Sequence, residues 1–173
     1  MALGADALHT SSFFRKGTLL FVGTTLAVIA LDQWTKSLAR TYLLGAGGPR
    51  SIPLLGEYIR LTYVQNRGAA FGLLQDQTTF FILVGVVVIA VIVASYRQIK
   101  EPSWGLNLCL GLQMGGALGN LVDRIRYGHV VDFVDLTFWP VFNVADSAIC
   151  VGVALLAWNL LFGRQDVGPS ARA

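Results

Sequence analysis

Four stretches without a charged residue dominate this sequence, and their lengths limit the fold more than any other feature. They cover residues 17–31, 77–96, 102–122 and 147–163. A helix needs about 20 apolar residues to cross the roughly 30 Å hydrocarbon core of a bilayer. The second and third stretches are long enough, and 54% of all residues are hydrophobic while 13% are charged. The sequence therefore predicts a mainly α, polytopic membrane protein.

The first and last stretches are too short alone, so we expect them to extend into flanks that include Asp32 and Asp146. We predict a single membrane domain, residues 1–173, built on a four-transmembrane-helix bundle. The predicted spans are 17–38, 77–96, 102–122 and 146–163, and the predicted outer segments are 39–76 and 123–145. A cleaved signal peptide is the alternative interpretation of the first stretch, but it contains no convincing small-x-small cleavage site, which favours a retained anchor.

Basic residues predict the orientation, because Lys and Arg gather on the cytoplasmic side close to span ends. The more tightly placed set is Arg15, Lys16, Arg97, Lys100, Arg164 and Arg172. We therefore expect both termini in the cytoplasm and the two longer segments outside. The net charge of +3 comes from basic residues that are scattered along the chain, so we expect membrane lipid contacts and no nucleic acid partner. Cys109 and Cys150 lie in apolar stretches and are interpreted as packing residues.

The outer segment 39–76 has a pattern of its own. YIRLTYV alternates apolar and polar residues at the period of a strand, so we predict a small sheet on the outer side. NRGAAFG is rich in small residues, which fits either a tight turn or the close approach of a ligand. In the third stretch Gly111, Gly115 and Gly119 recur every four residues, a spacing that lets a neighbouring helix come close.

Polar residues gather at the predicted outer ends of the helices, where they can converge on one site. They are Asp32 and Lys36 in LDQWTK; Asn120, Asp123 and Arg124 in GNLVDR; His129, Asp132 and Asp135 in HVVDFVDL; and Asn143 and Asp146 in FNVADS.

Each group also has a structural interpretation. For Asp32 and Lys36 we favour an ion pair on the helix surface over a catalytic role. Asp123 and Arg124 can end a helix near lipid headgroups, although Arg124 is also a good donor to a bound carbonyl. Asn120 and Asn143 can be capping residues or peptide-binding amides. For His129 we favour an interfacial residue over a ligand.

Asp132 and Asp146 make the strongest case for chemistry. Asp146 alone can be a helix N-terminal charge, but that does not account for Asp132 in the apolar context VVDF. Two facing carboxylates share one proton, so one can take a proton from water while the other donates to a scissile carbonyl. Which of the two starts protonated stays open. Ser147 has no histidine base nearby in the sequence, Cys109 lies deep in a predicted helix, and no HExxH zinc motif occurs.

Taken together, five motifs resemble those of the lipoprotein signal peptidase (signal peptidase II) family, the aspartic proteases of the bacterial inner membrane. The motifs are LDQWTK, NRGAAF, GGALGNLVDR, VVDFVD and FNVADSA, and the resemblance covers residues 17–163. It implies an aspartyl endopeptidase and no metal or organic cofactor. The substrate implied is a prolipoprotein, cut on the N-terminal side of a diacylglyceryl-modified cysteine near the outer leaflet. Globomycin-type cyclic peptides are implied as inhibitors.

The resemblance also implies residue roles. Asp132 and Asp146 match the catalytic pair, and Asp32 and Lys36 match a motif whose role looks structural. We place Asp123 with these two as a structural polar residue. The positions that bind the substrate backbone or support the aspartates are matched by Asn66, Gly68, Asn120, Arg124 and Asn143. Gln113 and Met114 depart from the plainer apolar residues expected there.

Two rival functions remain. A small proton-coupled transporter would also use aspartates near the membrane, but it predicts carboxylates through the bilayer depth, and residues 77–96 and 102–122 contain none. A non-catalytic assembly factor would use the polar residues to bind a partner helix, and it predicts that the isolated protein cleaves nothing.

Overall fold

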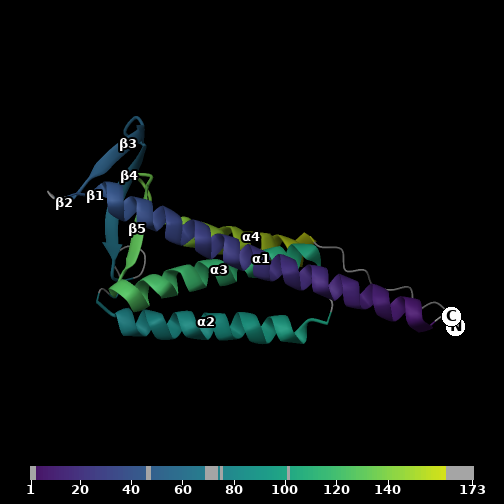
Figure 1. Ribbon diagram of the computed structural model, residues 1–173. Coiled ribbons are helices and arrows are strands. Elements are labelled where there is room, and N and C mark those ends of the chain that lie inside the picture. The colour runs from purple at the N-terminus through teal and green to yellow at the C-terminus, as the bar shows by residue number, and fades with distance from the viewer. Residues whose placement is uncertain (1–2, 46–47, 69–73, 75, 101, 163–173) are drawn as a thin grey trace.

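The described residues form four helices, a two-stranded sheet and a three-stranded sheet (Figure 1). A computed structural model describes residues 3–45, 48–68, 74, 76–100 and 102–162, with side chains described from Gly17 onward. In chain order the elements are α1 (Leu3–Leu43), β1 (Leu44–Gly45), β2 (Gly48–Pro49), β3 (Ser51–Leu55), β4 (Ile59–Asn66), α2 (Thr78–Gln98), α3 (Trp104–Tyr127), β5 (Val130–Asp135) and α4 (Val144–Phe162). The prediction of a mainly helical protein with a small β segment is confirmed.

Within the described ranges, three helical segments are long and apolar enough to cross a membrane. They are Gly17–Leu43, Thr78–Gln98 and Val144–Phe162. The predicted third span, 102–122, falls in α3, which is not among the three. Its composition explains why, because α3 carries buried polar residues such as Asn107, Asn120 and Asp123. These polar residues face neighbouring helices, since α3 packs against α1, α4 and α2 (Figure 1).

Glycines on α3 permit the close contact with α1, as the spacing of four predicted. A Cβ atom added at Gly115 would lie 2.6 Å from Val28 Cβ and 2.9 Å from the carbonyl oxygen of Thr25. Real side chains do not approach so closely, so any larger residue would push the two helices apart. Glycine at position 115 therefore allows α1 and α3 to pack closely.

Both ends of α3 carry capping residues of the usual kind. At the start, the side chain of Ser103 accepts a hydrogen bond from the backbone N–H of Leu106 at 3.2 Å. At the other end Gly128 adopts a left-handed conformation with φ 74°, and its N–H donates to Arg124. The chain then turns sharply into β5, which places Asp132 beside the end of the bundle.

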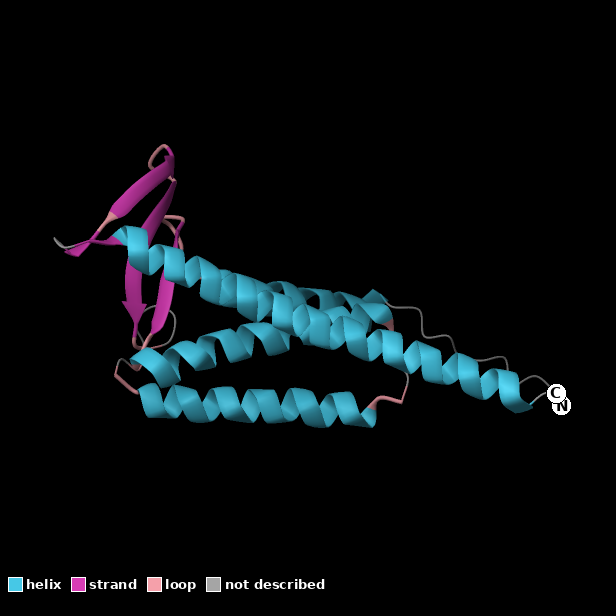
Figure 2. Cartoon of the chain, in the orientation of Figure 1, coloured by secondary structure: helices cyan, strands magenta, loops and turns pink. Residues whose placement is uncertain are grey.

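The strands lie at one end of the helices, and β3, β4 and β5 run across the long axes of the helices (Figure 2). Three of them form an antiparallel sheet in the order β3-β4-β5. The alternating segment predicted as a strand is β4. The sheet also includes β5, from the outer segment 123–145, where we predicted no strand. VVDFVD is buried almost throughout, so it lacks the alternation that reveals a strand with one exposed face.

A small apolar cluster joins this sheet to α1. It contains Ala39, Leu43, Tyr63, Val131 and Phe133. Further contacts bring the chain back beside β5, because the N–H groups of Phe133 and Val134 both donate to the carbonyl oxygen of Phe142. Asn143, the next residue, is thereby held near Asp132.

Candidate active site

Asp132 lies on β5 and is 1% exposed. Its two carboxylate oxygens accept hydrogen bonds from different amides: Asn143 Nδ2 donates at 2.6 Å and Asn66 Nδ2 at 2.9 Å. Burial, with the nearby negative charge of Asp146 as the second cause, raises the pKa of Asp132 to about 7. At neutral pH this carboxyl group can therefore both hold and release a proton.

Asp146 lies in the first turn of α4 and is half-buried. Its Oδ1 accepts from Asn120 Nδ2 at 2.7 Å, and its Oδ2 accepts from the backbone N–H of Asn143 at 3.2 Å. In return the backbone N–H of Asp146 donates to Asn143 Oδ1 at 2.9 Å. These reciprocal bonds form a helix N-terminal cap, so the structural interpretation of Asp146 and Asn143 holds. The cap leaves the Asp146 side chain near enough to Asp132 for its negative charge to act on that carboxyl group.

Asn143 is fully buried and contacts both carboxylates. Its side-chain oxygen is occupied by the N–H of Asp146, so its amide nitrogen must face Asp132. The structure therefore brings the two predicted catalytic residues to the same asparagine, from β5 and from α4.

Asn66 and Gly68 reach the same site from the end of β4. Antiparallel register pairs Val64 with Asp132 and Asn66 with Val130, so Asn66 is a diagonal neighbour of Asp132. The side-chain oxygen of Asn66 accepts from the N–H of Gly68 at 3.0 Å, which turns its amide nitrogen towards Asp132. The rest of the NRGAAF motif, residues 69–71, lies outside the described residues.

Asp32, Lys36 and Asp123 form a buried ionic cluster. Lys36 Nζ lies 2.9 Å from Asp32 Oδ2 and 3.1 Å from Asp123 Oδ2, and all three side chains are fully buried. The predicted ion pair of Asp32 with Lys36 is confirmed, but its predicted location on the helix surface is wrong. The physical reason is Gly119, where a Cβ would lie 2.6 Å from Asp32 Oδ2, so α3 covers the pair closely.

The ionic cluster is tied to the chain around the two aspartates. Asp32 Oδ1 accepts from the N–H of Ala145 at 3.0 Å, and Asp123 Oδ2 accepts from the N–H of Val131 at 3.0 Å. Ala145 precedes Asp146, and Val131 precedes Asp132. We did not predict a role for Gln33, yet its amide donates to Asp32, Asp123 and the carbonyl of Gly119. The sequence feature that could have indicated a role for Gln33 is its place directly after Asp32 in LDQWTK.

Arg124 is half-buried and its charge interacts with those of Asp146, Asp132 and Asp123. Its guanidinium carbon lies 5.2 Å from the centre of the Phe81 ring. A cation so placed can donate to a carbonyl bound near the aspartates, which is the functional one of the two predicted alternatives.

His129 and Asp135 have other surroundings. Burial, with the charge of Arg67 as a further cause, lowers the pKa of His129, and its ring lies 6.1 Å from that of Tyr127. Asp135 is three residues from Asp132 on β5, so the two side chains point to opposite faces of the strand. The N–H of Thr137 donates to Asp135 and holds the pKa of its carboxyl group below the usual value.

Among the described residues, no cluster of His, Cys, Asp and Glu is placed to hold a metal ion.

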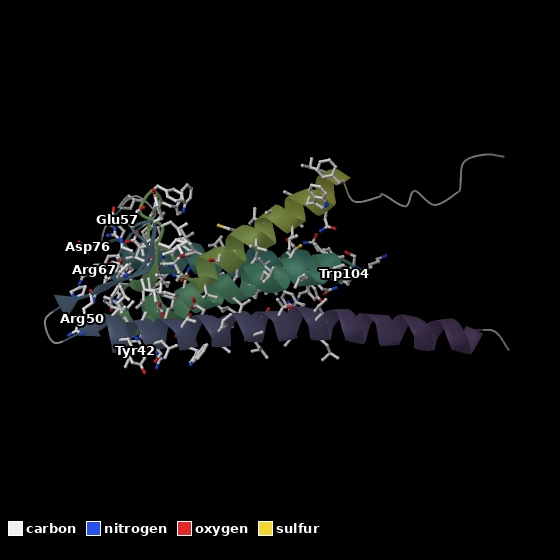
Figure 3. The ribbon with its side chains drawn as sticks, turned by 90° about the horizontal axis from the view of Figure 1, so that it is seen from above. Tyr42, Arg50, Glu57, Arg67, Asp76 and Trp104 are labelled. Carbon is white, nitrogen blue, oxygen red and sulfur yellow. The ribbon has the colours of Figure 1, made fainter. Side chains whose placement is uncertain are left out.

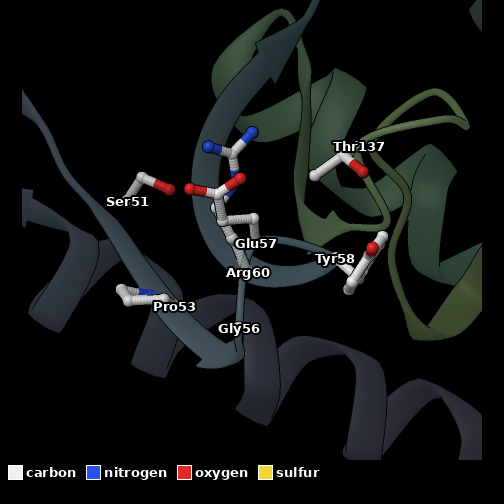
Figure 4. Close-up of a pocket in the computed structure, with 7 residues that line it drawn as sticks. All are labelled: Ser51, Pro53, Gly56, Glu57, Tyr58, Arg60 and Thr137. Carbon is white, nitrogen blue, oxygen red and sulfur yellow. The ribbon is translucent and has the colours of Figure 1, made fainter.

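A cavity of about 730 Å³ lies over the β3-β4 hairpin. Figure 4 shows Ser51 and Pro53 on one side of it and Tyr58 and Thr137 on the other. None of the described residues that line it is among the predicted site residues. The cavity is therefore separate from the predicted site.

The comparisons with known proteins agree with one another. A family model described as Signal peptidase (SPase) II matches residues 24–162. A lipoprotein signal peptidase of Moorella thermoacetica is 47% identical over 148 residues, which are 86% of this chain and 97% of the relative. A second, from Caldanaerobacter subterraneus subsp. tengcongensis, is 51% identical over 137 residues, which are 78% of this chain and 91% of the relative.

One solved structure is similar in fold as well as in sequence. Its description reads "Bacterial membrane enzyme structure by the in meso method at 2.3 A resolution". The TM-score is 0.73 at 30% sequence identity, and the alignment covers 88% of this chain and 94% of that one. The family match, the identity to relatives and the shared fold lead to one conclusion: the chain belongs to the signal peptidase II family.

Proposed function

We propose that this protein is a membrane aspartyl endopeptidase that removes the signal peptide from diacylglyceryl-modified prolipoproteins. The cut is on the N-terminal side of the lipid-modified cysteine, and Asp132 and Asp146 activate the attacking water. The relatives' name, lipoprotein signal peptidase, supports the substrate class. The observation that carries the mechanism is the arrangement of two carboxylates around Asn143, one of them with a pKa of about 7.

The proposed reaction divides the work between the two carboxyl groups. Asp132, buried and protonated, donates a hydrogen bond and then its proton to the oxygen of the scissile carbonyl. Asp146, which is half-buried, takes a proton from water, whose oxygen attacks the carbonyl carbon. The tetrahedral intermediate then breaks its carbon–nitrogen bond as Asp146 gives the proton taken from water to the leaving amine of the cysteine. As the carbonyl re-forms, one hydroxyl of the intermediate returns a proton to Asp132, and both carboxyl groups regain their starting states. Arg124 supports this step because its charge offsets the negative charge of the site.

The location of the pair fits a substrate held in the membrane. Asp146 is in the first turn of an apolar helix, and Asp132 is on the strand that adjoins the bundle. A peptide bond close to a lipid anchor would be presented at this depth, whereas one in a soluble protein would not.

We also propose that α3 crosses the membrane with α1, α2 and α4, because its polar residues face those helices. The four helices and the outer sheet then form one membrane domain in the bacterial inner membrane, with both termini in the cytoplasm.

The test uses the purified protein and a lipid-modified prolipoprotein, with cleavage followed as a gel shift. Asp132→Asn and Asp146→Asn, made separately, should each lower kcat by roughly 10³-fold or more while the protein stays folded. The matched control is Asp135→Asn on the same strand, which should keep most of the activity because Asp135 faces the other side.

Three outcomes contradict the proposal. Near-normal cleavage by a folded Asp132→Asn or Asp146→Asn variant would make the mechanism wrong. Failure of the wild-type protein to cleave would favour a non-catalytic assembly factor. A proton flux in liposomes that vanishes in Asp32→Asn would favour a transporter.

A globomycin-type cyclic peptide should block cleavage by the wild-type protein.

A further inference from the structure

The ammonium group of Lys36 contacts three oxygen atoms inside the bundle. Two belong to Asp32 and Asp123, and the third is Asn120 Oδ1 at 2.9 Å. An ammonium group has three N–H donors and no acceptor. The three oxygens therefore use all of its hydrogen-bonding capacity, and Lys36 is 0% exposed.

This contact determines which way the Asn120 amide points. If the amide were turned over, its NH₂ group would face the ammonium group, and two donors would meet without an acceptor in a buried site. The side-chain oxygen of Asn120 must therefore face Lys36. It accepts a second hydrogen bond there, from Asn143 Nδ2 at 3.2 Å.

With its oxygen held, Asn120 presents its nitrogen to the reacting pair. Asn120 Nδ2 donates to Asp146 Oδ1 at 2.7 Å, one of the shortest side-chain hydrogen bonds of the site. We propose that Lys36 is a positioning residue for Asp146, because it fixes the Asn120 amide in the one orientation that supplies an N–H donor to this carboxylate. This inference rests on the proposed function and goes beyond the structural role expected from the ion pair alone.

The arrangement separates two tasks that a buried lysine can have. Neutralising Asp32 and Asp123 needs a positive charge but no contact with Asn120. Orienting Asn120 needs a donor at the amide oxygen. The two can be tested apart, because each buried acid can be made neutral without touching Asn120.

The test variant is the charge-matched double substitution Lys36→Met/Asp32→Asn in the full-length protein. Lys36→Met alone would leave two buried carboxylates without a cation, whereas the double variant keeps the net charge of the cluster. Its matched control is Asp32→Asn, which keeps Lys36 on Asn120. A second charge-matched pair, Lys36→Met/Asp123→Asn with the control Asp123→Asn, serves if the first does not fold.

We expect the charge-matched variant to lower kcat by roughly 10- to 100-fold, the usual effect of losing an outer-shell partner. KM for a lipid-modified prolipoprotein should stay nearly constant, because Lys36 is buried and does not reach the substrate. The control keeps Lys36 on Asn120, so its kcat should fall less than that of the charge-matched variant. Thermal unfolding and gel filtration identify which variants are folded.

A further comparison asks whether Lys36 acts through Asn120. Asn120→Ala removes the donor itself, so adding this substitution to the charge-matched variant should cost no more kcat than Asn120→Ala alone. If the fold losses in kcat from Asn120→Ala and from the charge-matched variant multiply, Lys36 and Asn120 act independently. That result would overturn the inference.

Two other results would also overturn it. A folded charge-matched variant with wild-type kcat would remove the positioning role, while the Asp132 and Asp146 substitutions test the proposed function separately. Failure of both charge-matched variants to fold, with both controls folded, would assign Lys36 a purely structural role.

Discussion

Asn143 shows how a single residue can serve the fold and the site together. Its side-chain oxygen caps α4, and its side-chain nitrogen donates to Asp132. Because the cap determines the direction of the amide, the local rule for starting a helix also determines the surroundings of the proposed acid. The two predicted alternatives for Asn143, a capping residue or a functional amide, therefore do not exclude each other.

The pH dependence of cleavage should reflect Asp132. Its pKa is raised to about 7, so the protonated form that donates to the carbonyl is present below about pH 7 and is lost as the pH rises. We expect kcat/KM to fall tenfold per pH unit well above this value. A pH–rate profile measured with the lipid-modified substrate checks this, and a rate that stays constant from pH 6 to about pH 9 would contradict it.

Asn66→Ala should change the pH at which kcat/KM begins to fall. The amide of Asn66 donates to Asp132 and lowers its pKa, so removing it raises the pKa and shifts the fall in kcat/KM to higher pH. Thr62→Ala is the control, because Thr62 donates to Asp135 on the other face of β5. A shift to lower pH in the Asn66 variant would show that its hydrogen bond does not stabilise the ionised carboxyl group.

Spacing in the sequence predicted the contact of Asp32 with Lys36, because residues four apart share a helical face. It could not predict that Asp123 completes the cluster or that Asn120 contacts Lys36. Those contacts join residues 84 or more positions apart and depend on how α1 packs against α3. The resemblance to a family identified Asn66 and Asn120, but only the packed helices show what each one touches.

Among the elements, α3 and β5 bring the site together. α3 carries Asn120, Asp123 and Arg124 past α1 and α4, and β5 carries Asp132 back across the end of the bundle. The sequence predicted β4 because apolar and polar residues alternate along YIRLTYV. It did not predict β5, because a strand buried on both faces has the same apolar pattern as a short piece of helix.

The contact of α3 with α1 should be sensitive to volume at Gly115. Gly115→Leu would drive a side chain into Val28 and the backbone of Thr25, and should destabilise the protein by about 1–3 kcal/mol. Cleavage should fall as well, because Lys36 and Asn120 would be drawn apart. The measurements are thermal unfolding in detergent and kcat.

Gly23→Leu is the control for this substitution. A Cβ at Gly23 meets nothing within 4 Å, so the same side chain on α1 has free space. Equal destabilisation by the two substitutions would mean that the effect comes from the added leucine and not from the contact of the helices.

The surface of the molecule differs between its ends and its middle. Figure 3 places Arg50, Glu57, Arg67 and Asp76 at the sheet end and Trp104 at the opposite end. The exposed side chains between these ends include many apolar residues of α2 and α4. A layer of lipid around the middle of the helices would cover these residues and leave both polar ends in water.

The proposed orientation predicts which end a reagent in the medium can reach. Glu57→Cys, at the hairpin, should react with a membrane-impermeant maleimide in intact spheroplasts, whereas Lys100→Cys, between α2 and α3, should react only after permeabilisation. Both positions are exposed. Cys109→Ala and Cys150→Ser remove the native thiols first. The opposite labelling pattern would invert the predicted topology.

The order of the elements along the chain determines when the site can exist during synthesis. Asn66 and Asp132 meet across 66 residues, and Asp146 arrives only with α4, after every other described helix and strand. Under the proposed mechanism, a nascent chain whose α4 is still inside the ribosome lacks Asp146 and should cleave no substrate.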